Sequence, residues 1–224
     1  MAEARARARV SAVPTALSAA TRAEIFTAAE RLFAVTGFHG VSIRDITAAA
    51  GVNVAAVNYH FGTKDDLLLE IFRTRAAELN RERARRLHEV QVRHGEPPPL
   101  REILAALFAP PIRWLYARDA RRIALQFILR VRFEGTAAMI ELLRGDVSHL
   151  SRFAAALQAA MPGVPEELIY WRLHFCLGLV HNNRPAEFER LHRLSHGITR
   201  DADPDAMLER MLDFAVAGCG AGHA

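Results

Sequence analysis

The sequence predicts an all-α protein with a small N-terminal domain and a larger C-terminal domain. Apolar residues recur at helical spacing in nearly every segment, whereas no sustained apolar–polar alternation bounded by hairpin turns occurs. The chain has 224 residues, of which 51% are hydrophobic, and this is enough to fill a sizeable helical core. We divide it into an N-terminal arm (1–20), a first domain (21–69) and a second domain (70–224).

The arm, MAEARARARVSAVPTALSAA, is rich in Ala and Arg. It lacks the continuous apolar core of a signal peptide, so we expect a disordered basic arm and no export. Two alternatives remain open for the arm. One is that it has no specific function, and the other is that Arg5, Arg7 and Arg9 follow a DNA minor groove.

Residues 42–64, SIRDITAAAGVNVAAVNYHFGTK, have the pattern of a helix-turn-helix. Ser42 can cap the first helix, and Asp45 three residues later closes a capping box. Gly51 suits the positive φ that commonly ends a helix, and Asn53 can cap the next helix. The motif therefore predicts two short helices joined by a sharp turn.

The second helix of the motif has two different faces. Val57 and Phe61 can anchor one face, whereas the small residues Ala55 and Ala56 leave the other face slim enough to enter a major groove. This pattern predicts that the second helix reads DNA.

A further helix is predicted directly after Gly62, because Thr63 and Asp66 have the spacing of a second capping box. Lys64, the only lysine of the chain, stands at its start. A cation there is mildly unfavourable to the helix dipole, so we interpret Lys64 as a DNA phosphate contact. The alternative is a solvated surface residue.

The stretch AAERLFAVTGFHGVSIRDITAAAGVNVAAVNYHFGTKDDLL carries an Ala-x-x-Leu-Phe core, a Gly-Phe turn, the helix-turn-helix and a Tyr-x-Phe-x-x-Lys close, in that order. The positions concerned are Ala29, Leu32, Phe33, Gly37, Phe38, Tyr59, Phe61 and Lys64. Over residues 22–69 the chain thereby resembles the N-terminal domain of TetR-type transcriptional repressors. The resemblance implies a homodimer that binds a palindromic operator in double-stranded DNA and is released by a small effector.

The resemblance also implies which residues contact the operator. The residues that face the bases would be Ser42, Arg44, Asn53, Ala55, Ala56 and Asn58. Those nearer the phosphates would be Tyr59, His60 and Lys64. The charge distribution agrees with this, since residues 1–64 hold seven basic and four acidic side chains in a chain of net charge +4.

Beyond residue 64 the apolar periodicity predicts more helices. A long helix over 64–89 joins the two domains, and HGEPPP at 94–99 is the best linker. Further helices are expected over 100–108, 120–134, 136–160, 165–183 and 205–217, with interruptions at Pro110-Pro111 and at the MPGVP turn. This larger helical domain would serve dimerisation and ligand binding.

Two of these helices are candidates for a dimer seam. The residues expected to face the seam are Trp171, Phe175, Gly178 and Asn182 in one helix, and Leu208, Met211, Leu212 and Ala215 in the other. Such a pair from each subunit could form a four-helix seam. Ordinary core packing is the alternative, because every apolar stripe must face something.

Bulky side chains spread over several helices indicate an apolar cavity for an effector, although protein cores have the same composition. The segment WRLHFCLGLVHNN (171–183) also places His174 and His181 in an apolar pattern, where they could orient a carboxylate. The predicted ligand-binding residues are Phe108, Trp114, Phe127, Trp171, His174, Phe175 and His181.

The pattern Trp171-Arg172-x-His174-Phe175-x-Leu177-Gly178, together with GVNVAAVNYHFG, is similar to the fatty-acid-responsive PsrA-like subgroup of TetR-type regulators. The similarity implies a small apolar effector, a fatty acyl or aromatic acid.

The sequence lacks the residue patterns that other classes of function require. The chain offers no Ser elbow, phosphate loop or metal triad, so we expect no enzyme, no catalytic residue, no metal and no cofactor. The most apolar stretch, 168–180, is too short to span a bilayer, which argues against a membrane partner. Cys176 and Cys219 lie far apart in the sequence and suit a reduced cytoplasm better than a disulfide framework. An effector-independent or architectural DNA-binding protein and an activator remain alternatives.

Overall fold

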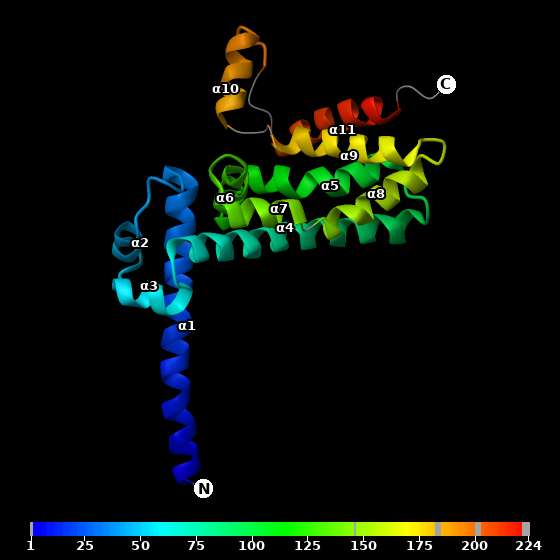
Figure 1. Ribbon diagram of the computed structural model, residues 1–224. Coiled ribbons are helices and arrows are strands. Elements are labelled where there is room, and N and C mark those ends of the chain that lie inside the picture. The colour runs from blue at the N-terminus through cyan, green and yellow to red at the C-terminus, as the bar shows by residue number, and fades with distance from the viewer. Residues whose placement is uncertain (1, 146, 182–184, 200–202, 221–224) are drawn as a thin grey trace. The chain divides into compact units, whose positions relative to one another are not determined.

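The computed structural model describes residues 2–145, 147–181, 185–199 and 203–220, with side chains from residue 18 onward except at 185 and 186. Every regular element in these ranges is a helix, which confirms the predicted all-α class (Figure 1). The helices are α1 (Ala2–Thr36), α2 (Ile43–Ala50), α3 (Val54–Phe61), α4 (Lys64–His94), α5 (Leu100–Leu115), α6 (Ala120–Glu134), α7 (Ala137–Gly145), α8 (Ser148–Ala160), α9 (Glu166–His181), α10 (Pro185–Leu194) and α11 (Pro204–Gly220).

The chain forms two compact units. Unit 1 comprises Met1–Arg75 and Gln126–Leu142, and unit 2 comprises Ala76–Leu125 and Leu143–Ala224. Unit 1 therefore extends beyond the predicted boundary at residue 69 and also takes in most of α6 and part of α7. Sequence periodicity could not assign these later helices to the first unit, because it reports only local structure. Both α4 and α6 contribute residues to each unit.

Unit 1 has an aromatic centre made by the end of α1, the turn after it and α6. Phe33, Phe38 and Phe127 are almost completely buried. The ring centroids of Phe33 and Phe38 lie 5.9 Å apart in an edge-to-face arrangement, and those of Phe38 and Phe127 lie 5.1 Å apart. Such pairs contribute beyond their buried area, so these rings stabilise the packing of α6 against the end of α1 and the turn after it.

Hydrogen bonds fix the same junction. The amide of Phe38 donates to Glu134 Oε2 over 2.7 Å, and Arg130 Nε donates to the carbonyl of Ala34 over 2.9 Å. Gly37 between them has φ +100°, and a Cβ there would lie 2.7 Å from Glu134 Oε2. Glycine is required at this turn both for its backbone conformation and for the space that the Glu134 carboxylate occupies.

A buried ion pair joins α1 to the first part of α4. Glu30 is 2% exposed, and its two carboxylate oxygens accept from Arg75 Nε at 2.6 Å and Arg75 Nη2 at 2.7 Å. The Arg75 guanidinium also lies 5.2 Å from the ring centroid of Phe26. A carboxylate is tolerated in this interior because the two-point contact neutralises it.

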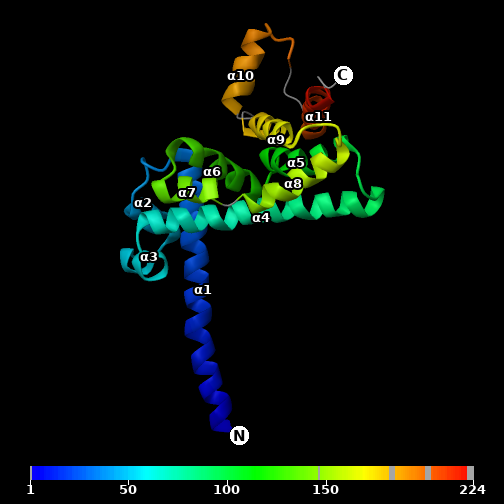
Figure 2. The same ribbon diagram turned by 45° about the vertical axis from the view of Figure 1, so that its right-hand side comes forward.

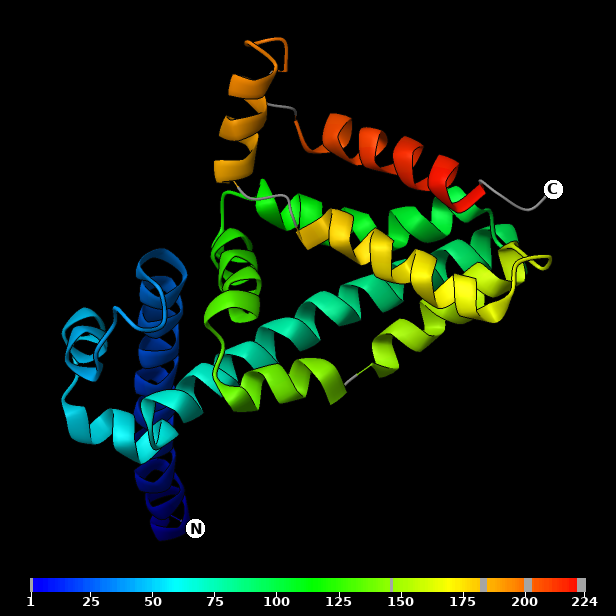
Figure 3. The same cartoon turned by 45° about the horizontal axis from the view of Figure 1, so that its top comes forward.

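In unit 2, α5 packs against α8, α9 and α11 around a continuous apolar core. Figures 2 and 3 show α9 and α11 next to each other in this unit. Among the described residues, no helix is both long and apolar enough to cross a bilayer.

The interruption predicted at Pro110-Pro111 is wrong, since α5 continues through both prolines to Leu115. Pro111 has no N–H for the carbonyl of Leu107, and Arg83 Nε of α4 donates to that carbonyl instead over 3.1 Å. Arg83 is buried, and burial lowers its pKa to about 10, so it remains protonated at neutral pH. A distant side chain thus replaces the hydrogen bond that the proline removes.

Other elements differ from the sequence-based prediction in detail. The segment 136–160 forms two helices, α7 and α8, and α10 was missed although Pro185 suits a first helical position. The arm, expected to be disordered, belongs to α1 from Ala2 onward. Ala and Arg are strong helix formers, and the prediction neglected that propensity.

Candidate nucleic-acid interface

The first helix of the predicted motif is α2, and its caps are those that the sequence indicates. Ser42 Oγ accepts from the amide of Asp45 over 3.2 Å, and Asp45 Oδ2 accepts from the amide of Ser42 over 2.8 Å. The side-chain and backbone hydrogen bonds from Ser42 lower the pKa of Asp45. Gly51 ends the helix at φ +66°. These local contacts fix both ends of α2 and direct the chain into the turn before α3.

The second helix is α3, which lies beside α1 and α2 in unit 1 (Figure 1). Asn53 Oδ1 accepts from the amide of Ala56 over 2.9 Å and caps it. Val57 and Phe61 are buried, as predicted for the anchoring face. Tyr59 on the opposite side is 82% exposed. An aromatic side chain left in water on a short anchored helix is a candidate for contact with a partner.

The start of α4 carries the second predicted capping box. The amide of Thr63 donates to Asp66 Oδ2 over 2.9 Å, and the amide of Asp66 donates to Thr63 Oγ1 over 3.1 Å. Lys64 is half-buried, and its Nζ lies 5.8 Å from the centroid of the Phe33 ring. This cation–π contact gives a structural reason for the cation at the start of α4. The sequence did not predict it, because Phe33 and Lys64 are far apart in the chain.

Eight of the nine predicted DNA-contacting residues lie on α2 or α3 or cap them, and the ninth, Lys64, is the first residue of α4. The exposed ones are Ser42, Arg44, Asn53, Ala55, Asn58 and Tyr59, and the half-buried ones are Ala56, His60 and Lys64. Ser42 and Asn53 already use their side-chain oxygens as caps. Contact of these nine with DNA stays a prediction.

Arg22 is a further cation in this region that the sequence did not predict. The guanidinium of Arg22 on α1 lies 4.8 Å from the centroid of the Phe61 ring and pairs with Glu70. This arrangement holds a positive charge beside the end of α3. No sequence signal indicated it, because Arg22 and Phe61 are far apart in the chain.

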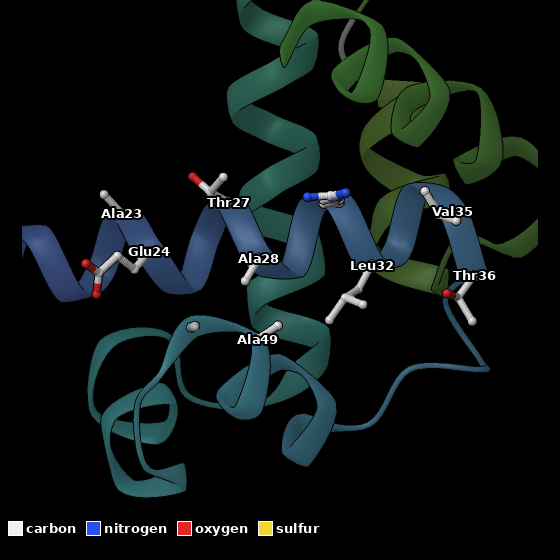
Figure 4. Close-up of a pocket in the computed structure, with 10 residues that line it drawn as sticks. Ala23, Glu24, Thr27, Ala28, Leu32, Val35, Thr36 and Ala49 are labelled. Atoms are coloured by element: carbon white, nitrogen blue, oxygen red, sulfur yellow. The ribbon is translucent and has the colours of Figure 1, made fainter. Parts of the chain in front are cut away.

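Unit 1 also has an open groove of about 900 Å³ along α1 and the end of α2. Figure 4 shows Ala28 and Leu32 of α1 on the side where Ala49 of α2 lies. Its lining is mostly small side chains, and it includes none of the nine predicted DNA contacts. Nothing in its chemistry indicates a ligand.

The structure does not bring the seven predicted ligand-binding residues into one cavity. Phe127 belongs to the aromatic centre of unit 1, whereas Phe108 and Trp114 are buried in unit 2, where Trp114 Nε1 donates to Glu82 Oε2 over 2.8 Å. The remaining four, Trp171, His174, Phe175 and His181, are on α9: the first three are exposed and the last is half-buried.

Instead, α9 carries an aromatic cluster on its outer side. Trp171 is 51% and Phe175 63% exposed, and their rings stack with centroids 5.9 Å apart. The ring of His174 lies edge-on to Trp171 at 6.0 Å. Periodicity correctly placed Trp171 and Phe175 on one face but could not show which side of the helix faces the core. The buried stripe of α9 consists of Ile169, Leu173, Cys176 and Val180.

The outcome on α11 is different. The residues expected at the seam, Leu208, Met211, Leu212 and Ala215, are buried in the core of unit 2, as the alternative of ordinary core packing predicts. A large apolar side chain that this helix exposes is Phe214, at 68%. Asn182, also expected at the seam, lies outside the described residues.

Two family models match the chain. The model described as bacterial regulatory proteins, tetR family, matches residues 25–71, and the model described as tetracyclin repressor-like, C-terminal domain, matches residues 105–218. The first match covers the helix-turn-helix, and the second covers α6 to α10 and most of α5 and α11.

Among curated relatives, the transcriptional repressor AcnR of Corynebacterium glutamicum is 33% identical over 100 residues, which cover 44% of this chain and 47% of AcnR. The dual regulator CecR of Shigella flexneri is 31% identical over 122 residues, which cover 50% of this chain and 54% of CecR. The matches thus span about half the length of these relatives.

Solved structures share the fold over a larger part of the chain. NalD, the secondary repressor of the MexAB-OprM multidrug efflux pump in Pseudomonas aeruginosa, is 25% identical with a TM-score of 0.58, covering 88% of this chain and 94% of NalD. A transcriptional regulator from Saccharomonospora viridis in complex with choline is 21% identical with a TM-score of 0.57. The match covers 86% of this chain and 94% of that regulator.

Proposed function

The chain belongs to the TetR family of bacterial regulatory proteins, and from this premise we propose that it is a cytoplasmic transcriptional repressor. It binds a palindromic operator as a homodimer and leaves the DNA when a small apolar effector binds. Members of this family act by binding DNA and are not enzymes. The observation that carries the proposal is α3, a short capped helix held by Val57 and Phe61 with its other side exposed.

The exposed side of α3 has the chemistry of a major-groove reader. Ala55 and Ala56 permit close approach, and Asn58 can pair with an adenine edge. Arg44 on α2 can reach a guanine or a phosphate. Tyr59, His60 and Lys64 stand where the helix passes the DNA backbone, and hydroxyl, imidazole and ammonium groups all suit phosphate oxygens.

Two substitutions separate base reading from phosphate binding. Arg44→Ala should weaken binding to the operator by about 1–3 kcal/mol and leave random DNA little affected, because a guanine contact exists only on the operator. Lys64→Ala should weaken both DNAs about equally, because both have phosphates. Fluorescence anisotropy with the two duplexes measures the four losses. Equal losses on operator and random DNA for Arg44→Ala would remove Arg44 from the base-reading set.

The exposed cluster on α9 supports the homodimer. Stacked aromatic rings left in water, with Phe214 exposed on the neighbouring α11, form the kind of apolar surface that marks protein–protein contact. A two-fold axis would place the same cluster from each subunit in one interface. Dimerisation is also what DNA reading needs, since one helix-turn-helix reads few base pairs. We therefore assign Trp171 and Phe175 to the dimer face.

Effector sensing is assigned to unit 2, which contains the buried Phe108 and Trp114. The choline complex of the Saccharomonospora viridis regulator supports small-molecule binding by this fold. Since α4 and α6 each run through both units, an effector that favours one position of these helices could change the separation of the two α3 helices in the dimer.

A panel of fatty acyl and aromatic acids tests the sensing half of the proposal. Titrated into a preformed operator complex, at least one acid should release the DNA, with a neutral sugar as the control that does not. The anisotropy of labelled operator measures the release. If no acid releases the DNA, the effector-independent or architectural alternative replaces this half of the proposal.

A separate measurement distinguishes a repressor from an activator. Transcription from the operator is compared with and without the protein, and a repressor should lower it.

A further inference from the structure

Cys176 of α9 and Cys219 of α11 are brought together in the core of unit 2. Their Sγ atoms lie 3.9 Å apart, and the side chains are only 3% and 4% exposed. The two residues are far apart in the sequence, so this pair is a product of the fold. Within the described part of the chain no third metal-ligating side chain joins them, which leaves thiol chemistry as what the pair can do.

The two thiols are chemically unequal. The hydrogen bond with Cys176 and the charge of Arg172 lower the pKa of Cys219, against the opposing effect of burial. The hydrogen bond with Cys219 and burial raise the pKa of Cys176. The positive charge of Arg172 and the place of Cys219 near the end of α11 favour the Cys219 sulfur as the attacking group, and the Cys176 sulfur is the neighbouring thiol that can resolve an oxidised product.

Cys219 also lies where a buried thiol can reach solvent. It is the last residue but one of α11, and Gly218 and Gly220 stand on either side of it. Helix ends open at little cost, and glycine weakens a helix relative to alanine. Opening of this final turn would expose Cys219 without unfolding unit 2.

We propose that Cys176 and Cys219 are a redox-sensitive pair that a hydroperoxide converts into an intramolecular disulfide, with access through opening of the α11 end. The Cys219 thiolate attacks one peroxide oxygen and forms a sulfenic acid, while the other oxygen leaves as hydroxide and takes up a proton to give water. The Cys176 thiol then displaces water from the sulfenic acid and forms the S–S bond. Two thiols and one hydrogen peroxide thus give one disulfide and two waters, and an external dithiol reverses the step.

The disulfide would link α9, which carries the proposed dimer face, to α11. Bond formation brings the sulfurs from 3.9 Å to about 2.05 Å, which requires a small shift of side chains or helices. The chemistry itself does not depend on DNA binding, so it is tested separately from the proposed function.

The test treats the reduced full-length protein with hydrogen peroxide, blocks the remaining thiols with N-ethylmaleimide and measures the intact mass. The expected product is a monomeric chain that has lost two hydrogens, carries no maleimide and recovers both thiols after dithiothreitol. Cys176→Ser and Cys219→Ser should each prevent this product. Two blocked thiols after peroxide, or a chain that gains oxygen atoms without forming the disulfide, would overturn the proposal.

Glycine substitutions test the access route without removing a thiol. A Cβ at Gly218 meets no atom within 4 Å, so Gly218→Ala fits and strengthens the last turn. Disulfide formation should then slow about fivefold. Gly163→Ala, which also meets no atom within 4 Å and lies in the turn before α9, should leave the rate unchanged. Equal rates for the two variants would refute access through the α11 end.

Discussion

Phe127→Ala is expected to destabilise unit 1 by about 3–5 kcal/mol, the cost of removing a fully buried aromatic side chain. The Phe127 ring packs 5.1 Å from that of Phe38, so its loss leaves a cavity at the junction of α6 with the end of α1. For a chain of this length the melting temperature should fall on the order of 10 °C. Chemical denaturation and thermal melting followed by circular dichroism measure the change.

Phe133→Ala is the matched control, since it removes the same side chain from the same helix where it is 69% exposed. A substitution of this kind should change stability by only about 0.5 kcal/mol. Similar losses for the two variants would show that the aromatic centre does not hold unit 1. Operator binding should be lost only under conditions where the Phe127→Ala protein unfolds.

The double substitution Trp171→Ser with Phe175→Ser is expected to weaken dimerisation at least about 100-fold, or about 2.7 kcal/mol. Both rings are exposed in the single chain and would be buried in the dimer, and each substitution occurs twice in a homodimer. Analytical ultracentrifugation over a concentration series measures the dissociation constant. Circular dichroism should stay unchanged, because neither ring belongs to the core of unit 2.

Val92→Ser serves as the control for this prediction. Val92 is 73% exposed on α4 and lies outside the proposed dimer face, so its replacement should leave the dimer intact. A double variant that dimerises as strongly as Val92→Ser would place the interface elsewhere. A monomeric double variant should also lose most of its operator affinity, because one α3 helix then binds one half-site.

The sequence was most informative where function depends on local structure. Local spacing of three or four residues predicted both capping boxes, the Gly51 turn and the burial of Val57 and Phe61. The structure confirms all of these features. The exposed positions of the candidate base-reading residues then follow from the helical period. Their contact with DNA is not tested by the fold.

Long-range packing is what the sequence could not supply. Most of α6 belongs with the N-terminal helices because Phe127 packs against Phe38. Helix α5 continues through Pro110-Pro111, where Arg83 donates a hydrogen bond to the carbonyl of Leu107. The pattern of α9 likewise did not reveal that Trp171 and Phe175 face water. Each of these features depends on partners that are distant in the chain.

The measurement that tests the central claim most directly compares three duplexes: the palindromic operator, one half-site, and the operator with five base pairs inserted between its half-sites. Two α3 helices held by one dimer need half-sites about one helical turn apart, and five extra base pairs turn one of them to the opposite face of the DNA. The account predicts two chains on the intact operator, affinity that falls steeply with salt, and at least about 100-fold weaker binding to the other two duplexes at the same salt concentration. Equal affinity for all three duplexes would contradict it.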